Sequence, residues 1–222
     1  AEEELRRILP VITALRRKTN ALISVDTTKA EVAEAALAAG ADIINDISAG
    51  RFDPRMLPLA AATGAGLILM HMQGTPATMQ LDPRYQDVLA EVKAFLEERV
   101  EAAESGGVKR ESLIIDPGIG FGKNLGDNLV LINNLASFGE LGRPVLVGIS
   151  RKSFIGDILN LGPQERLEGT IAAAVVSLLR GAALLRVHDL RAVQRAVKGA
   201  ETIASRGAKK PPREGQRKTY VH

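Results

Sequence analysis

The sequence contains no cysteine and no tryptophan, and aromatic residues make up only 3% of its 222 residues. The absence of cysteine excludes disulfide bonds, thiolate metal sites and cysteine nucleophiles. With so few aromatic rings, the chain offers no stacking platform for nucleic acid, and Ala, Leu, Ile and Val must fill its core. The longest mainly apolar stretch, residues 171–179, is far too short to span a membrane, and no signal-type segment precedes the first predicted helix. These absences predict a cytoplasmic protein without nucleic-acid or membrane partners.

The formal net charge of +3 is concentrated near the C-terminus. Residues 205–222 hold six Lys or Arg residues against Glu214 alone, so the remainder of the chain carries a net charge of −2. This segment also contains Pro211-Pro212 and almost no apolar residues, which is typical of a solvated or disordered end. We therefore predict one domain over residues 1–204 and a basic, disordered tail over residues 205–222.

Short apolar runs alternate with helical patterns along the predicted domain. Each run indicates a buried strand, and strands that are separated by helices pair in parallel. The predicted strands are 22–25, 42–45, 67–70, 112–115, 144–148 and 182–187, and the predicted helices are 2–17, 28–39, one after Pro54, 84–104, 127–138, 164–180 and 189–204. This alternation predicts an α/β fold, a TIM-type (β/α)8 barrel with about six of its eight strand–helix units present.

Polar blocks follow five of these runs at the point where each run ends. The blocks are residues 26–29, 45–46, 116–123, 150–153 and 186–189. In a parallel barrel the carboxyl ends of the strands open on one face. We therefore expect the five blocks to form a single site on that face.

Three strand-end residues suggest recognition of a planar heterocycle. The carboxylate of Asp116, after which Pro117-Gly118 turns the chain, is suited to accept paired hydrogen bonds from a guanidine-like edge. Asp26 and Asn45 end adjacent strands, and a carboxylate beside a carboxamide matches the alternating edge of a bicyclic ring. The structural alternatives are a turn cap for Asp116, a helix N-cap for Asp26 and a buried turn for Asn45.

Cationic and hydroxyl side chains in the last two blocks suggest anion recognition. Lys152 stands at the start of a short predicted helix, where a cation opposes the helix dipole and so needs a functional reason. Ser153 follows it, and Arg186 and His188 share one side of a predicted strand end. The alternatives are that Lys152 is simply solvated beside its neighbouring arginine, and that the histidine is structural.

The blocks resemble those of the dihydropteroate synthase family in both order and spacing. The matching motifs are Met70 to Gln80, Asp116 to Lys123, Ser150 to Phe154 and Arg186 to Asp189. The resemblance implies a transferase of folate biosynthesis that condenses 6-hydroxymethyl-7,8-dihydropterin diphosphate with p-aminobenzoate. It also implies Mg²⁺ as cofactor, a homodimer and inhibition by sulfonamides.

The resemblance assigns a ligand to each candidate residue. It places the pterin against Asp26, Asn45, Met70, Asp116 and Lys152, the p-aminobenzoate against Phe121, Lys152 and Ser153, and the diphosphate against Arg186 and His188. The residues that it implies for catalysis are Asp26, Asp116 and Lys152. Met70 has an alternative as ordinary core, because an apolar residue at a strand end is usually that.

Two family motifs are not found in this sequence. The family carries an Asn near a Pro-Asp-Ser-Phe-Ser-Asp loop and a Glu-Ser-Thr-Arg loop on two earlier strands, and the Mg²⁺-linked residue is that Asn. No metal ligand is therefore assigned within the chain. We expect residues 1–222 alone to have at most weak pterin affinity and to form no dihydropteroate.

Two other functions remain open at this level. One is a methyltetrahydrofolate:corrinoid methyltransferase, which also binds a pterin in a barrel but needs neither a diphosphate site nor an aminobenzoate site. The other is a non-catalytic or truncated pterin-binding fragment, which the two missing motifs favour.

Overall fold

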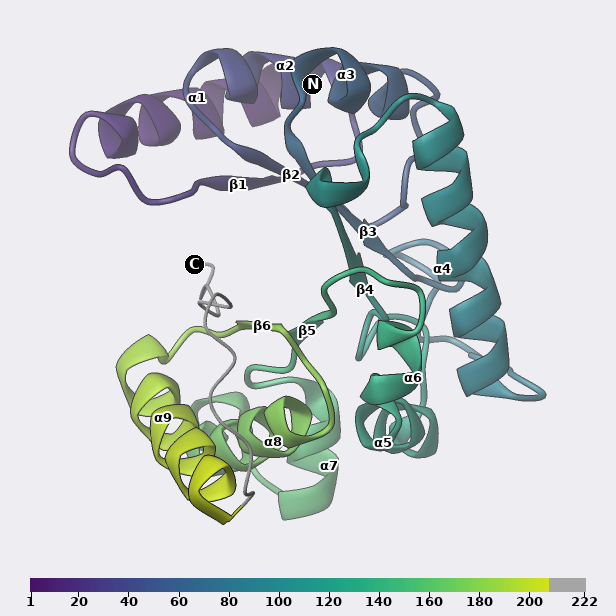
Figure 1. Ribbon diagram of the computed structural model, residues 1–222, viewed down its shortest axis with the longest axis vertical. Helices are drawn as coiled ribbons and strands as arrows, with labels where there is room; N and C mark the ends of the chain where they lie inside the picture. The colour runs from purple at the N-terminus through teal and green to yellow at the C-terminus, as the bar shows by residue number, and fades with distance from the viewer. Residues whose placement is uncertain (208–222) are drawn as a thin grey trace.

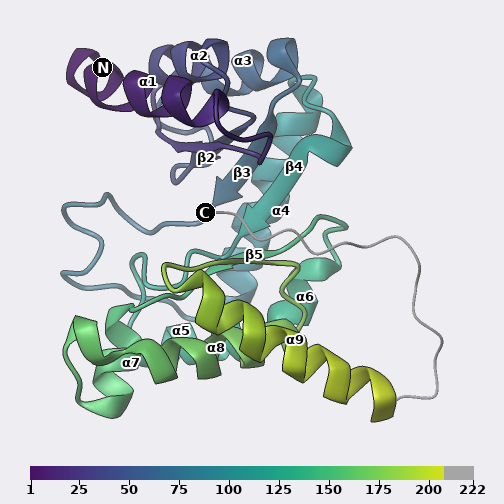
Figure 2. The ribbon, with the colours of Figure 1, turned by 90° about the vertical axis from the view of Figure 1, so that its left-hand side faces the viewer.

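The computed structural model describes residues 1–207. The strands in this part are β1 (Ser24–Asp26), β2 (Ile43–Asp46), β3 (Gly66–Met70), β4 (Leu113–Asp116), β5 (Leu146–Gly148) and β6 (Leu184–Arg186). The helices are α1 (Glu2–Arg16), α2 (Ala30–Ala38), α3 (Met56–Thr63), α4 (Val88–Ser105), α5 (Leu125–Asn133), α6 (Leu135–Gly139), α7 (Ser153–Leu159), α8 (Leu167–Leu179) and α9 (Leu190–Gly207), with 3-10 turns η1 (Arg110–Ser112) and η2 (Pro163–Glu165). In Figure 2, α1, α2 and α3 form one layer above the strands, and α7, α8 and α9 form a second group below them.

All strand pairs are parallel and follow the chain order. Strands β1 to β4 form one sheet and β5 pairs with β6, while a single bridge between Ile115 and Val145 joins the two sheets. Within residues 1–207 no strand pairs with the outer edge of β1 or of β6, and these two strands face each other at the two ends of the array (Figure 1). The predicted six-stranded partial barrel is therefore confirmed.

Aliphatic side chains fill both sides of the strand array. The interior cluster consists of Ile43, Ile68 and Leu146 with Ile114 and Leu184 packed against it, so five of the strands contribute one residue each. The larger cluster lies between the strands and the surrounding helices. Because both faces are covered, all four residues of β2 are buried, as expected for a parallel strand.

Several predicted boundaries shift, and each shift has a local cause. The predicted helix 127–138 is two helices, α5 and α6, which meet at Asn134. The predicted helix 84–104 begins only at Val88, because the carboxylate of Asp87 accepts from the backbone N–H groups of Leu89 and Ala90. Beyond Gly207 the predicted basic tail lies outside the described residues. None of the described helices is both long and apolar enough to cross a membrane.

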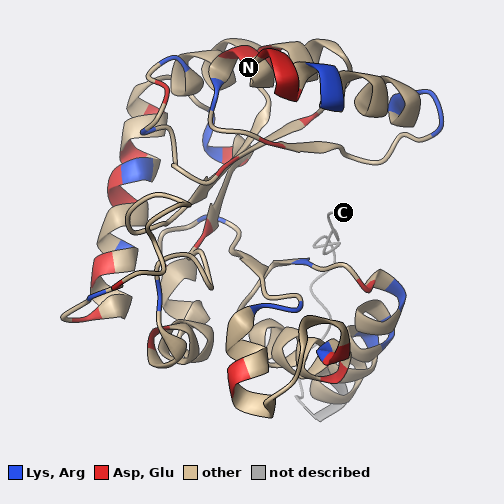
Figure 3. Ribbon diagram, turned by 180° about the vertical axis from the view of Figure 1, so that it is seen from behind, with Lys and Arg blue, Asp and Glu red and all other residues tan. Residues whose placement is uncertain are grey.

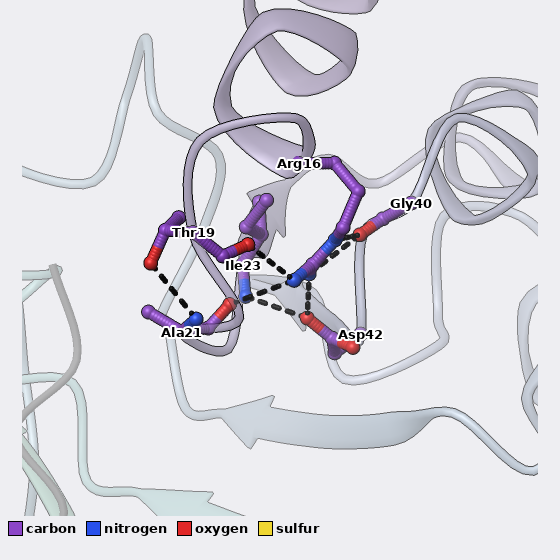
Figure 4. Close-up of polar contacts among 6 residues, drawn as sticks. All are labelled: Arg16, Thr19, Ala21, Ile23, Gly40 and Asp42. Atoms are coloured by element: carbon purple, nitrogen blue, oxygen red, sulfur yellow. Dashed lines mark hydrogen bonds and ion pairs between the residues drawn. The ribbon is translucent and has the colours of Figure 1, made fainter.

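One arginine ties the end of α1 to the start of β1 and β2 (Figure 4). The guanidinium of Arg16 donates to the carbonyl of Gly40 through Nε (2.9 Å) and Nη2 (2.8 Å), and to the carbonyls of Thr19 and Ala21 through Nη1. It also forms an ion pair with Asp42, whose Oδ2 accepts from the backbone N–H of Ile23 at 2.8 Å. Helical periodicity alone does not indicate this role of Arg16 in the loop.

Replacing Arg16 by methionine is expected to lower the free energy of unfolding by about 2 kcal/mol, because three loop carbonyls lose a charged donor. In a chain of this size that corresponds to a melting temperature lower by about 4–8 °C. Thermal unfolding followed by circular dichroism measures the change. The control is Arg17→Met at the neighbouring exposed position, and equal effects of the two variants would contradict the assigned role.

Candidate functional site

The carboxyl ends of β1 to β4 bring four predicted site residues together. Asp26 lies opposite Asn45 in the strand register, and Met70 lies opposite Asp116. β2 and β3 are themselves paired, so these residues end four neighbouring strands. Acidic positions occur on the strands as well as on the helices (Figure 3), which is unusual for a parallel sheet.

Asn45 has a buried carboxamide that nothing in the described protein satisfies. The residue is 2% exposed, and neither Nδ2 nor Oδ1 forms a hydrogen bond of normal geometry within residues 1–207, although the carboxamide lies near enough to Asp26 to lower the pKa of that carboxyl. Burying such a group without a partner costs free energy, and native proteins rarely accept that cost away from functional sites. The side chain is therefore suited to bind a ligand that supplies both a donor and an acceptor.

Asp116 is a buried carboxylate at the end of β4. It is 1% exposed, and its Oδ1 accepts from the backbone N–H of Gly118 at 2.7 Å, so the turn-cap alternative describes one of its contacts. Burial raises the pKa of this carboxyl, while the charges of Lys152 and Arg186 act in the opposite direction. Burial thus disfavours the charged form of Asp116, and two cations, Arg186 on β6 and Lys152 in the loop after β5, favour it.

The glycine-rich loop after β4 is held by side chains at four successive carbonyls. These are Ile119 O bound by Lys152 Nζ, Gly120 O by Gln80 Nε2, Phe121 O by Lys123 Nζ and Gly122 O by Tyr85 Oη. A Cβ on Gly118 would lie 1.9 Å from the carbonyl oxygen of His71, so only glycine permits this close approach. The loop is therefore fixed in place before any ligand arrives.

Lys152, in the loop after β5, lies against Phe121 of the glycine-rich loop. The ammonium of Lys152 lies 4.4 Å from the centroid of the Phe121 ring, within the range of a cation–π contact. Burial lowers the pKa of Lys152 to about 8. Lys152 is half-buried and its ammonium binds the Ile119 carbonyl, so the lysine is not simply solvated. Ser153, the first residue of α7, is exposed.

Arg186 and His188 lie beside the ends of β1 and β5. A guanidinium nitrogen of Arg186 lies 3.5 Å from the Asp26 carboxylate, which links the two outer strands of the array. The Arg186 side chain also covers Gly148, where a Cβ would come within 3.2 Å of Nε. His188 is exposed, and its Nδ1 lies 2.9 Å from the hydroxyl of Ser150.

The N-cap alternative for Asp26 is not supported, because the residue that precedes α2 is Lys29.

A buried lysine–histidine pair was missed in the sequence. Lys123 is 3% exposed and His71 is 7% exposed, and Lys123 Nζ lies 2.9 Å from His71 Nδ1. Burial lowers the pKa of Lys123 to about 7 and that of His71 to about 3. Each residue lies in one of the two longest motifs, so the sequence did indicate that both are near the site. Their contact could not be predicted, because it joins loops 52 residues apart.

Comparisons with known proteins agree with this arrangement. The model of the pterin binding enzyme family matches residues 1–188. Dihydropteroate synthase of Escherichia coli K12 is 47% identical over 204 residues, which is 92% of this chain and 72% of that protein. The Yersinia pestis dihydropteroate synthase, solved with a sulfonamide drug complex, has a TM-score of 0.89 at 40% identity. The match covers 92% of this chain and 74% of that chain.

A third comparison includes the reaction product. The Xanthomonas albilineans dihydropteroate synthase in complex with 7,8-dihydropteroate has a TM-score of 0.86 at 46% identity, over 92% of this chain and 75% of that chain. The resemblance seen in the motifs therefore extends over nearly the whole described structure. The chain belongs to the dihydropteroate synthase family of pterin-binding enzymes.

Proposed function

We propose that this protein transfers a pterinylmethyl group from 6-hydroxymethyl-7,8-dihydropterin diphosphate to p-aminobenzoate, as a dihydropteroate synthase. The observation that carries the proposal is the buried, unpartnered carboxamide of Asn45 beside strand-end carboxylates. The product complex of the Xanthomonas relative supports the same chemistry. Neither a methyl transfer to cobalt nor a non-catalytic role is favoured by these observations.

The strand ends form the proposed pterin site. Asn45 supplies a donor and an acceptor, and the carboxylates of Asp26 and Asp116 accept from the amino and ring N–H groups. Met70, fully buried opposite Asp116, forms part of the wall. Lys152 borders this site from the loop after β5.

The aminobenzoate site is proposed to lie between Phe121, Lys152 and Ser153. The aromatic ring and the ammonium, 4.4 Å apart, offer a stacking face and a cation for a benzoate. Sulfonamides share the aromatic amine of p-aminobenzoate, so they compete for this site. The sulfonamide complex of the Yersinia relative supports that expectation.

The proposed reaction is a substitution at the pterin methylene carbon. The C–O bond to diphosphate breaks, the amine nitrogen of p-aminobenzoate forms the new C–N bond, and the nitrogen then releases a proton to solvent. Arg186 and His188 are proposed to bind the departing diphosphate, and Asp26 and Asp116 to stabilise positive charge that develops on the pterin methylene. The protein needs no nucleophile, so the absence of cysteine is no obstacle.

Magnesium was expected from the resemblance, but the described residues do not provide a site for it. Among residues 1–207 there is no group of three or more His, Asp or Glu side chains that could hold a metal ion. The strand-end carboxylates Asp26, Asp46 and Asp116 are each engaged by a protein donor. A role for Mg²⁺ therefore stays a prediction.

A homodimer is proposed to form through α7 and α8. Exposed apolar side chains gather on these two helices, which contact each other: Ile158, Leu159, Val176 and Leu179. Apolar surface of this kind favours association with a second copy. Sedimentation equilibrium measures the oligomeric state.

Replacing Asn45 by alanine tests the proposed pterin site. Because this carboxamide forms no hydrogen bond of normal geometry within residues 1–207, its removal is expected to cost little stability, whereas affinity for 6-hydroxymethylpterin should fall at least about tenfold. The matched control is Asn128→Ala, since Asn128 is also 2% exposed but binds the Gly120 N–H and the Asn124 carbonyl. That control should lose about 1–3 kcal/mol of unfolding free energy.

Calorimetric titration and urea unfolding of both variants give the comparison. Full pterin affinity in the Asn45 variant would contradict the site. Because two family motifs are not found in residues 1–222, binding by the parent chain is expected to be weak, so each ligand is tested up to its solubility limit. A parent chain that then binds neither pterin nor p-aminobenzoate, the latter assayed with pterin and diphosphate present, would reject the proposed function as a whole. Formation of 7,8-dihydropteroate in a steady-state assay would support it directly.

A further inference from the structure

Arg151 has a backbone conformation that a side chain rarely adopts. Its φ is +55°, and only Ala49 and Asn160 share a positive φ among the non-glycine residues of the described chain. This left-handed region is unfavourable for a residue with a Cβ, and it persists only where the surroundings hold it. The conformation at Arg151 therefore requires an explanation.

Side chains from three other segments hold Arg151 in this conformation. Its Nε and Nη2 donate to the two carboxylate oxygens of Asp189, each at 2.9 Å, and its Nη1 donates to Gln164 Oε1 at 2.9 Å. Its backbone N–H donates to the hydroxyl of the fully buried Thr170 at 3.0 Å, and its carbonyl accepts from Arg166 at 3.0 Å. Arg151 is therefore not simply a solvated neighbour of Lys152.

The residues on either side of Arg151 contact different parts of the site. The hydroxyl of Ser150 accepts from the backbone N–H of His188 at 3.2 Å, and Lys152 reaches the carbonyl of Ile119 in the glycine-rich loop. A turn of the backbone at position 151 would move these contacts relative to one another. The left-handed conformation thus sets the direction in which the lysine points.

We propose that Arg151 is a positioning residue, whose forked bond to Asp189 holds the loop of residues 150–153 and the loop of residues 186–189 as one unit. It thereby fixes Lys152 and Ser153 toward the aminobenzoate site without touching the substrate. The inference rests on the proposed function for the identity of that ligand. A lysine at position 151 cannot replace the fork, because its ammonium does not bind both carboxylate oxygens in one plane.

Stability alone does not account for this ion pair. Arg151 and Asp189 are 27% and 24% exposed, and ion pairs that solvent reaches contribute little to the free energy of unfolding. A planar pair with two parallel bonds does, however, fix geometry. The arrangement therefore suits the orientation of neighbouring groups better than the stabilisation of the fold.

Two variants separate the side chain from the strained backbone. Arg151→Gly removes the fork but accepts a positive φ freely, and Arg151→Lys keeps the charge but loses the fork. Both are expected to lower p-aminobenzoate affinity at least about tenfold, measured by calorimetry with saturating pterin and inorganic diphosphate, because the site is no longer held in place. Affinity for pterin alone is expected to fall by less, to no more than about threefold, because Asp26, Asn45 and Asp116 keep their positions while Lys152 only borders the pterin site.

The chain provides a matched control in a second forked pair. Arg55 binds Asp53 through Nε (3.1 Å) and Nη2 (3.0 Å) at the start of α3. Arg55→Lys therefore loses a fork of the same kind outside the two loops that Arg151 joins. This variant should bind p-aminobenzoate as the parent does.

A second measurement does not depend on substrate binding. Competitive labelling of amines with acetic anhydride over a pH series, read by peptide mass spectrometry, reports the pKa of each lysine. In the parent, the pKa of Lys152 is expected at about 8, and in Arg151→Gly it should rise toward its ordinary value as the ammonium leaves its buried position. Lys109, an exposed lysine that precedes η1, serves as the internal control, and its labelling profile should not change.

Each outcome decides the proposal. Unchanged aminobenzoate affinity or an unchanged pKa of Lys152 in Arg151→Gly would overturn it, and so would equal losses of pterin and aminobenzoate affinity, which indicate general disruption. If the parent binds no p-aminobenzoate, the proposed function fails, and the labelling result alone then decides whether Arg151 positions Lys152.

Discussion

Replacing Asp116 by asparagine is expected to weaken the binding of 6-hydroxymethylpterin by about 100-fold. The proposed ligand presents N–H donors to this carboxylate, and an asparagine offers an NH₂ group to one of them, so a charged hydrogen bond is lost and two donors meet. In a chain that also carries the two family motifs not found in residues 1–222, turnover should fall by at least the same factor, because the carboxylate is also proposed to stabilise positive charge in the transition state. Calorimetry and a steady-state product assay measure the two effects.

The stability of this variant is expected to move in the opposite direction. Asp116 is 1% exposed and burial raises its pKa, so the folded protein disfavours the charged form that the asparagine removes. The backbone N–H of Gly118 keeps an acceptor in the new side chain. Asp157→Asn, at an exposed position of α7, is the matched control and should change neither property. Parent-like affinity in the Asp116 variant would remove this carboxylate from the site.

Replacing Gly118 by alanine is expected to lower the free energy of unfolding by at least about 3 kcal/mol and to abolish measurable pterin binding. The new Cβ would lie 1.9 Å from the backbone oxygen of His71, a distance that no side-chain movement relieves. The loop after β4 or the end of β3 must then shift. Either shift displaces the carboxylate of Asp116, which binds the N–H of this glycine.

Gly64→Ala is the control that separates the steric clash of a new Cβ from the free-energy cost of placing alanine at a positive φ. Gly64 has a φ of +69°, against +68° at Gly118, but a Cβ there would meet nothing within 4 Å. This control is therefore expected to lose only about 1 kcal/mol. Urea unfolding of the two variants gives the difference directly, and equal losses would mean that the loop tolerates a side chain.

The positions of the site residues along the fold could be predicted from the sequence. Apolar runs that end in a polar residue identify strand ends, and the helices between them require parallel pairing. Asp26, Asn45 and Asp116 are therefore found where the alternation places them, at the carboxyl ends of neighbouring strands. The pattern of residues alone did not identify the ligand of these side chains as a pterin. That proposal came from the family resemblance.

Contacts between distant loops could not be predicted in this way. Periodicity shows which side of an element is buried, but it says nothing about which loop a long polar side chain reaches. The Arg151–Asp189 pair and the Lys123–His71 pair join segments 38 and 52 residues apart. The motif from Arg186 to Asp189 likewise gave no sign that the Asp189 carboxylate binds Arg151. The homodimer, the cytoplasmic location and the disordered tail stay predictions.

Because Tyr85 donates a hydrogen bond to the Gly122 carbonyl, the intrinsic fluorescence of this tyrosine can report movement of the glycine-rich loop. The protein has no tryptophan and only two tyrosines, of which Tyr220 lies outside the described residues. Ultraviolet emission of the folded domain therefore comes mainly from one phenol, 2.7 Å from a carbonyl of the glycine-rich loop. Burial raises the pKa of that phenol, so it stays protonated well into the alkaline range. Movement of the loop can thus be followed by the fluorescence of the unlabelled protein, with a Tyr220→Phe variant to remove the second signal.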